Sequence, residues 1–64
     1  EFEFHGTVSA LDATAHTFVL RGLTFTYDSN TSMQGVSLAN GVRVEIKATR
    51  AAGVWKATEI LTDD

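Results

Sequence analysis

The sequence predicts a small all-β domain, and two observations support that prediction. Residues 42–48 alternate strictly between apolar and charged side chains, which places Val42, Val44, Ile46 and Ala48 on one side of an extended strand. Similar but weaker alternation recurs along the rest of the chain, between glycines and other turn residues. We therefore expect several short strands that share one apolar core and turn their charged side chains to solvent.

Three strands are predicted in the N-terminal half, over residues 2–10, 16–21 and 23–28. Gly6 interrupts the first of them, where a residue without a side chain commonly marks a bulge or a bend. Asp12 lies in the first connection, where its carboxylate can accept hydrogen bonds from nearby backbone amides. The apolar side chains expected to face the core from these strands are Phe2, Phe4, Val8, Ala10, Phe18, Leu20, Leu23, Phe25 and Tyr27.

A turn-rich connection is predicted between the third and fourth strands. Asp28, Ser29 and Asn30 are typical turn residues, and residues 34–41 have the pattern of one helical turn that ends at a glycine. Leu38 is expected to close one end of the core from this helical turn. The connection thus predicts the one helical element of an otherwise all-β chain.

Two strands joined by a hairpin complete the predicted fold. The fourth strand contains residues 42–48, with Arg43, Glu45 and Lys47 toward solvent, and a hairpin loop at residues 50–53 leads to a last strand over residues 54–61. Strict alternation fails in that last strand, because it would put Ala57 and Ile60 on opposite faces. A bulge near Thr58 would bring both side chains to the core.

Five strands in this order, with a helical turn between the third and the fourth, match a small barrel of the OB type, closed or partly open. A small open sheet would expose an apolar face and unpaired edges, whereas a barrel internalises that face and removes most edges. We expect residues 1–64 to form a single domain. Because the sequence begins with Glu1 instead of Met, we also expect it to be part of a longer protein.

Composition and charge make two kinds of partner improbable. The net charge is −3, and the basic residues are scattered instead of clustered, so we expect no nucleic-acid binding. No apolar run approaches the ~18 residues of a membrane span. The chain has no cysteine that could form a disulfide.

Four segments resemble a bacterial family of small OB-like β-barrel domains that has no established activity. They are GTVSALD at residues 6–12, TFVL at 17–20, LANGVRVEI at 38–46 and ATEI at 57–60. Members of that family are commonly found in exported or envelope proteins, often as tandem copies. The resemblance therefore implies a barrel fold and a periplasmic, envelope or secreted location, but it implies no catalytic or binding residue.

The chain contains no recognisable catalytic motif, so we expect neither an enzyme nor a cofactor. A nucleophile elbow, a phosphate-binding loop and a pair of catalytic carboxylates are all missing from the sequence. His5 and His16 could meet only if the first two strands pair around residues 11–15, and two solvent-facing histidines are the simpler interpretation. We therefore assign no metal ligand.

The candidate binding residues are those of one strand face and one tryptophan. The outward face of the second and third strands corresponds to the surface that OB folds often use for oligonucleotides or oligosaccharides. Trp55 is either a stacking platform for a base or a sugar, or a cover for one open end of the barrel. The candidate ligand-binding residues are Thr17, Arg21, Thr24, Thr26 and Trp55.

These observations leave three functional hypotheses. The first is a non-enzymatic interaction module that binds an unknown protein or envelope component through its strand edges and its threonine-rich face. The second is a module that binds a small ligand or glycan with that face and Trp55. The third is a metal-dependent activity that uses His5 and His16.

Overall fold

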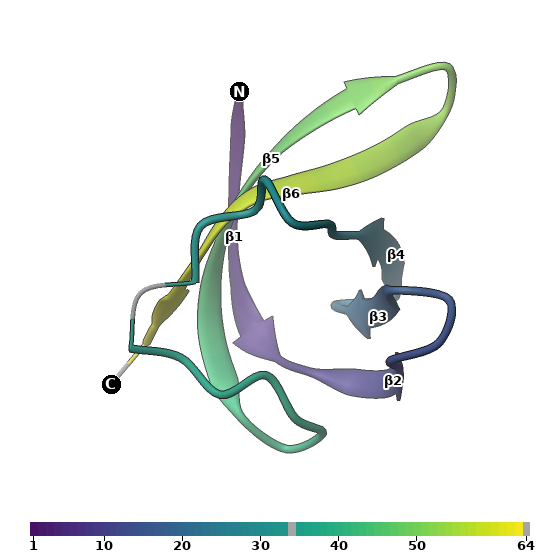
Figure 1. The fold of residues 1–64 in the computed structure, drawn as a ribbon. Helices are drawn as coiled ribbons and strands as arrows, with labels where there is room; N and C mark the ends of the chain where they lie inside the picture. The colour runs from purple at the N-terminus through teal and green to yellow at the C-terminus, as the bar shows by residue number, and fades with distance from the viewer. Residues whose placement is uncertain (34, 64) are drawn as a thin grey trace.

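The computed structural model describes residues 1–33 and 35–63, and these form one six-stranded sheet. The strands are β1 (Phe2–Thr7), β2 (Ser9–Asp12), β3 (Thr17–Leu20), β4 (Leu23–Thr26), β5 (Arg43–Ala51) and β6 (Val54–Thr62). Their order in the sheet is β1-β5-β6-β4-β3-β2, and the pair β4 and β6 is parallel whereas the other pairs are antiparallel. Figure 1 shows β5 and β6 as a long hairpin that reaches beyond the ring of the other strands.

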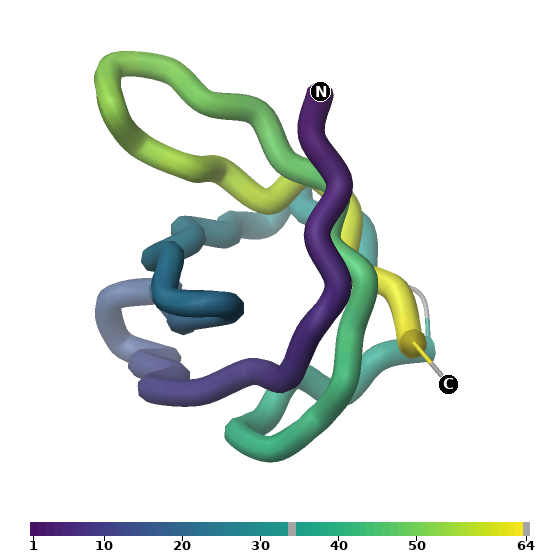
Figure 2. Tube along the Cα trace, turned by 180° about the vertical axis from the view of Figure 1, so that it is seen from behind, coloured from purple at the N-terminus to yellow at the C-terminus, as the bar shows by residue number. Residues whose placement is uncertain are grey.

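The sheet curls into a partly open barrel, as the sequence predicts. Its two end strands, β1 and β2, follow one another in the chain and are joined by the buried residue Val8. Seen from behind, β1 and β2 run as one continuous curve (Figure 2). The Val8 amide donates to the carbonyl of Val42, and the Val8 carbonyl accepts from Gly41. The predicted first strand therefore breaks at Val8 and continues to Asp12, beyond its predicted end.

Gly6 lets two strands approach closely instead of marking that break. A Cβ atom at Gly6 would lie 3.1 Å from Cγ of Arg21 and 3.2 Å from Cγ of Leu20. The Arg21 guanidinium also donates to the carbonyl oxygen of His5, at 3.4 Å. Side chains from the end of β3 thus close the gap between β1 and β3, where the sheet itself is not closed.

The core contains most of the side chains that alternation assigned to it. Its fully buried members are Val8, Phe18, Leu20, Phe25, Val44, Ile46, Ala48, Ala57 and Ile60. Phe2 and Ala10, by contrast, are exposed, so their predicted burial is wrong. Phe2 is the first residue of β1, next to the chain terminus, and it contacts the half-buried Trp55 at the margin of the core. Ala10 adopts a left-handed backbone (φ 49°) where the register between β2 and β3 shifts, and its side chain faces solvent.

The outer face of β5 is more covered than its charge pattern predicts. Arg43 is exposed, but Glu45 and Lys47 are half-buried. Neighbouring strands lie on both sides of them, and the Lys47 ammonium is 3.6 Å from the carboxylate of Glu59 on β6. The direction of these side chains was predicted correctly, whereas their full exposure was not.

The bulge predicted near Thr58 is confirmed. Ala48 pairs with Ala57 and Lys47 pairs with Glu59, so Thr58 has no residue opposite it in the ladder. The extra residue returns Ile60 to the core face, on which Ala57 also lies, and both are fully buried. The Thr58 hydroxyl donates to the Lys47 carbonyl across the bulge, at 3.1 Å.

The helical turn predicted for residues 34–41 is wrong over residues 35–41, the part that the structure describes. This segment is irregular, and Gly35 and Gly41 have left-handed backbones (φ 70° and 90°) that interrupt a right-handed helix. Its polar groups bond across the barrel, because Asn40 accepts from the Leu11 amide at 2.8 Å and Gly41 donates to Val8. Leu38 still packs against the core, as expected.

Both predicted turns of the N-terminal half are present. The Asp12 carboxylate accepts from the amides of Thr14 and Ala15, and the Asp28 carboxylate accepts from the amide of Asn30.

Among the described residues, the structure contains no helix that could cross a membrane.

Candidate functional site

An aromatic cluster lies beside the N-terminus on the concave side of the sheet. We call this cluster the aromatic end, and its members are Phe2, Phe4, Arg50 and Trp55. The rings of Phe2 and Phe4 stand nearly perpendicular to the Trp55 ring, with centroids 5.0 and 5.1 Å away. The Arg50 guanidinium lies over the Trp55 ring, 5.1 Å from its centroid. Alternation in β1, β5 and β6 explains the grouping, because all four side chains point to the concave side of the sheet.

Trp55 packs against the core and keeps part of its surface accessible. It pairs with the buried Phe25 in the parallel ladder of β4 and β6, and the two ring centroids are 6.0 Å apart. The indole is half-buried and belongs to the layer of side chains around the core. Trp55 thus has a packing role, and ligand stacking on its accessible surface stays a prediction.

The predicted threonine face lies on the opposite, convex side of the sheet. Thr17 pairs with Thr26, and Thr24 pairs with Val19, so the three threonines share one surface. Thr24 is exposed, and the Thr26 hydroxyl donates to the Trp55 carbonyl at 3.2 Å. We call the surface of Thr17, Val19, Thr24 and Thr26 the threonine face.

The five predicted binding residues therefore lie at three separate positions on the protein. The three threonines meet on the threonine face, whereas Arg21 lies between β3 and β1 with its guanidinium on the His5 carbonyl. The Trp55 indole lies on the concave side. A ligand on the threonine face would thus not stack on Trp55, and ligand binding by these five residues stays a prediction.

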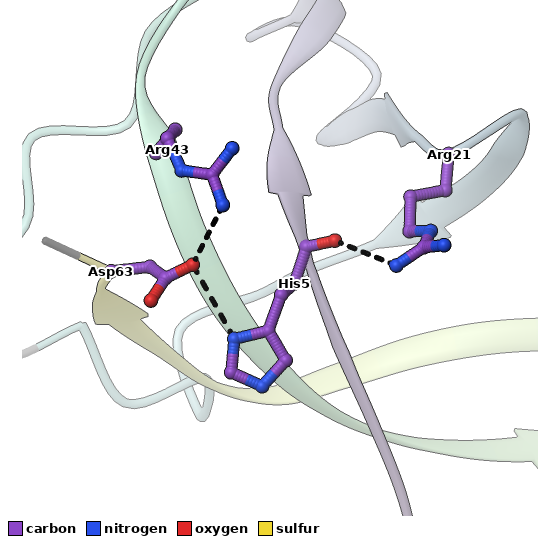
Figure 3. Close-up of polar contacts among 4 residues, drawn as sticks. All are labelled: His5, Arg21, Arg43 and Asp63. Atoms are coloured by element: carbon purple, nitrogen blue, oxygen red, sulfur yellow. Dashed lines mark hydrogen bonds and ion pairs between the residues drawn. The ribbon is translucent and has the colours of Figure 1, made fainter.

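His5 and His16 have different neighbours. The carboxylate of Asp63 lies between two basic groups, 3.4 Å from Nδ1 of His5 and 3.3 Å from Nη2 of Arg43 (Figure 3). His16 instead contacts Tyr27, with ring centroids 5.4 Å apart. The exposed ion pair of Arg43 and Asp63 contributes little stability, at most about 1 kcal/mol. In the described part of the chain, no group of three or more His, Cys, Asp or Glu side chains could hold a metal ion.

Sequence reasoning missed a groove at the end of the sheet where β3 begins and β4 ends. It has a volume of about 510 Å³ and is lined by His16, Tyr27, Asp28, Ser29 and Met33. The lining comes from the turn before β3 and from the irregular segment after β4, where no periodic pattern relates one residue to another. No pattern in the sequence predicts that Met33 and His16 line the same groove.

One carboxylate of this groove is already paired. The Asp28 carboxylate lies 2.9 Å from the ammonium of Lys56 and accepts from the Asn30 amide at 2.8 Å. The ammonium of Lys56 and the backbone amide of Asn30 hold the pKa of Asp28 below its usual value of 3.8. The acidic charge at the rim of the groove is therefore largely neutralised.

Comparison with known proteins identifies a family and a related fold. Residues 5–60 match the model of the Domain of unknown function (DUF5666). The crystal structure of Ag(I)CusF superimposes with a TM-score of 0.85 at 14% identity, covering 97% of this chain and 96% of that one. Identity this low shows a shared fold alone. No curated protein matches the sequence. Because the family model covers most of the chain, the protein belongs to the DUF5666 family, whose function is not known.

Proposed function

We propose that this domain is a non-enzymatic interaction module of an exported or envelope-associated bacterial protein. It binds an extended segment of a partner protein along the free edge of β1. Membership of a family without established activity is compatible with such a role. The resemblance to exported domains supports the location. The observation that carries the proposal is the open edge of β1 beside the aromatic end.

The edge of β1 offers unpaired backbone groups. β1 stands at one end of the sheet and pairs with β5 on its inner side. The carbonyl of His5 points away from β5, since it accepts from Arg21 on the opposite side (Figure 3). Every second residue of a strand presents its backbone groups to the same side, so the Glu3 amide and carbonyl also face outward. Arg21 already occupies the His5 carbonyl, so a partner strand would form its main-chain hydrogen bonds with the Glu3 amide and carbonyl.

The side chains beside this edge suit a protein interface. Phe2 is 50% exposed and contacts Trp55, on which Arg50 lies. Aromatic residues and arginine are enriched in interfaces and contribute much of their binding energy. Strand addition to an edge obtains affinity from the backbone and specificity from neighbouring side chains. The aromatic end supplies the neighbouring side chains that give specificity.

Site-specific photocrosslinking in the bacterium that makes the protein tests the proposal. A photoreactive phenylalanine analogue at Phe2 should give a discrete adduct with one partner. Val54 is the matched control, because it is equally exposed at 50% but pairs with Ala51 on the face opposite Trp55. Position 54 should give no such adduct.

A proline variant distinguishes binding at the β1 edge from nonspecific binding. Glu3→Pro removes an outward-facing amide, which an edge strand tolerates, and leaves the ladder to β5 intact. The variant should fold and lose the adduct formed from position 2. Equal adducts from positions 2 and 54, an adduct that survives in folded Glu3→Pro, or no adduct at all would contradict the proposal.

A small ligand or glycan on the threonine face is a second candidate function. The alignment of Thr17 with Thr26 and of Thr24 with Val19 favours it, since it places three hydroxyl groups on one surface. Titration with a glycan panel should then perturb the amides of Thr17 and Thr24. The fluorescence of Trp55 on the opposite face should stay unchanged. Perturbation of Trp55 without the threonines would exclude this candidate.

A further inference from the structure

The groove lined by His16 brings together two kinds of metal donor, an imidazole and a thioether. The chain has one methionine and two histidines, and this groove combines the methionine with one of the histidines. His16, Tyr27 and Met33 line it, together with the hydroxyl of Ser29. From this combination, we propose that the groove binds a soft monovalent metal ion, Cu(I) or Ag(I), between the His16 imidazole and the Met33 thioether.

The chemistry of the donors selects the type of ion. Thioether sulfur binds Cu(I) and related soft ions well, and imidazole is a common metal ligand. Calcium and magnesium require several oxygen ligands, whereas the carboxylate here, that of Asp28, is paired with Lys56 at 2.9 Å. No cluster of three or more His, Cys, Asp or Glu exists among residues 1–33 and 35–63, so a structural zinc site is not available there. Soft monovalent ions accept fewer ligands, which suits this donor set.

The backbone holds the imidazole over the groove in an unusual conformation. His16 has a left-handed backbone with φ 59°, a conformation that costs energy for a residue with a side chain. The Tyr27 amide donates to the His16 carbonyl at 3.1 Å, which fixes the peptide at the start of β3. Strain of this kind concentrates at functional sites. The imidazole lies beside the Tyr27 ring, with centroids 5.4 Å apart and ring planes at 72°.

Tyr27 and Met33 complete the site from the other side. Both are half-buried and pack against the core, so their positions are set by the fold. An aromatic ring attracts a cation held over its face, which adds to coordination by nitrogen and sulfur. Because Tyr27 and Met33 already pack on the core, metal binding is not needed for folding. The site is independent of the β1 edge.

Titration of the domain with Ag(I) in chloride-free buffer tests the site, with Ag(I) as an air-stable probe for Cu(I). NMR should show one Ag(I) per chain, with shifts of the Met33 methyl group and the His16 ring. His16→Ala and Met33→Leu should each weaken binding about tenfold or more. His5→Ala, the matched histidine control, should bind as the parent does. Circular dichroism shows whether each variant remains folded.

Three results would overturn the proposal. The first is the absence of binding, and the second is a shift at His5 with none at His16. The third is unchanged affinity in folded Met33→Leu. Zn(II) at the same concentrations provides a check on selectivity, because the proposed donor set should bind it more weakly than Ag(I).

Discussion

Replacing one buried valine with aspartate should unfold the domain. Val44 is fully buried in β5, opposite Gly6 of β1 and Thr62 of β6. The change loses about 1.5–3 kcal/mol of apolar burial. An unpaired buried charge costs roughly 3–5 kcal/mol more. A domain of 64 residues has a stability of about 3–10 kcal/mol, so the combined cost of about 4.5–8 kcal/mol is comparable to the whole stability of the fold.

Two further variants on the same strand calibrate this result. Thr49→Asp places the same charge at an exposed position opposite Lys56 and should remain folded. Ile46→Val removes one buried methylene and should cost about 0.5–1.5 kcal/mol. Since 1 kcal/mol corresponds to about 4–8 °C for a domain of this size, the thermal midpoint should fall by a few degrees. Circular dichroism and amide NMR dispersion measure both effects. A Val44→Asp variant with native dispersion would refute the assignment of this face to the core.

The other predictions concern charge and backbone conformation. Lys56 lowers the pKa of Asp28 in the folded state, so the ionised carboxylate stabilises the fold above pH 3.8. That stabilisation is lost as the pH falls through the lowered pKa. Asp28→Asn should therefore lower the thermal midpoint at pH 7, with a gap that closes in acid; a gap independent of pH would contradict the assignment. Ala52 precedes Gly53 in a hairpin turn where both residues have positive φ, so Ala52→Asn should raise the midpoint by several degrees, and a fall would argue against a strained turn. A low-salt titration should detect no micromolar binding of generic DNA or RNA, and salt-sensitive binding in that range would disprove this.

The sequence predicted the strands well because alternation and burial have the same cause. Val44, Ile46 and Ala48 are buried as expected, and the failure of alternation in the last strand correctly located the bulge at Thr58. The helical turn was predicted wrongly because local propensity does not include distant hydrogen bonds. Asn40 and Gly41 bond to residues about thirty positions earlier, and those contacts determine the path of the connection.

The candidate sites were harder to predict, because they depend on which faces meet after the sheet curls. Periodicity grouped Thr17, Thr24 and Thr26 correctly. It left the face of Trp55 open, since strict alternation fails in the last strand because of the bulge at Thr58. The groove between His16 and Met33 was unpredictable for a similar reason, because both residues lie outside regular strands.

Amide hydrogen exchange at the edge of β1 tests the proposed function most directly. The partner captured through position 2 would be added to the purified domain, and exchange would be followed at Glu3 and Phe4. The Glu3 amide faces outward and should exchange quickly in the free domain, whereas the Phe4 amide points toward β5 and should be protected already. Strand addition predicts that the partner slows exchange at Glu3 strongly. Unchanged exchange at Glu3, with perturbations confined to the threonine face or to the turns at residues 11–15 and 50–53, would contradict the account.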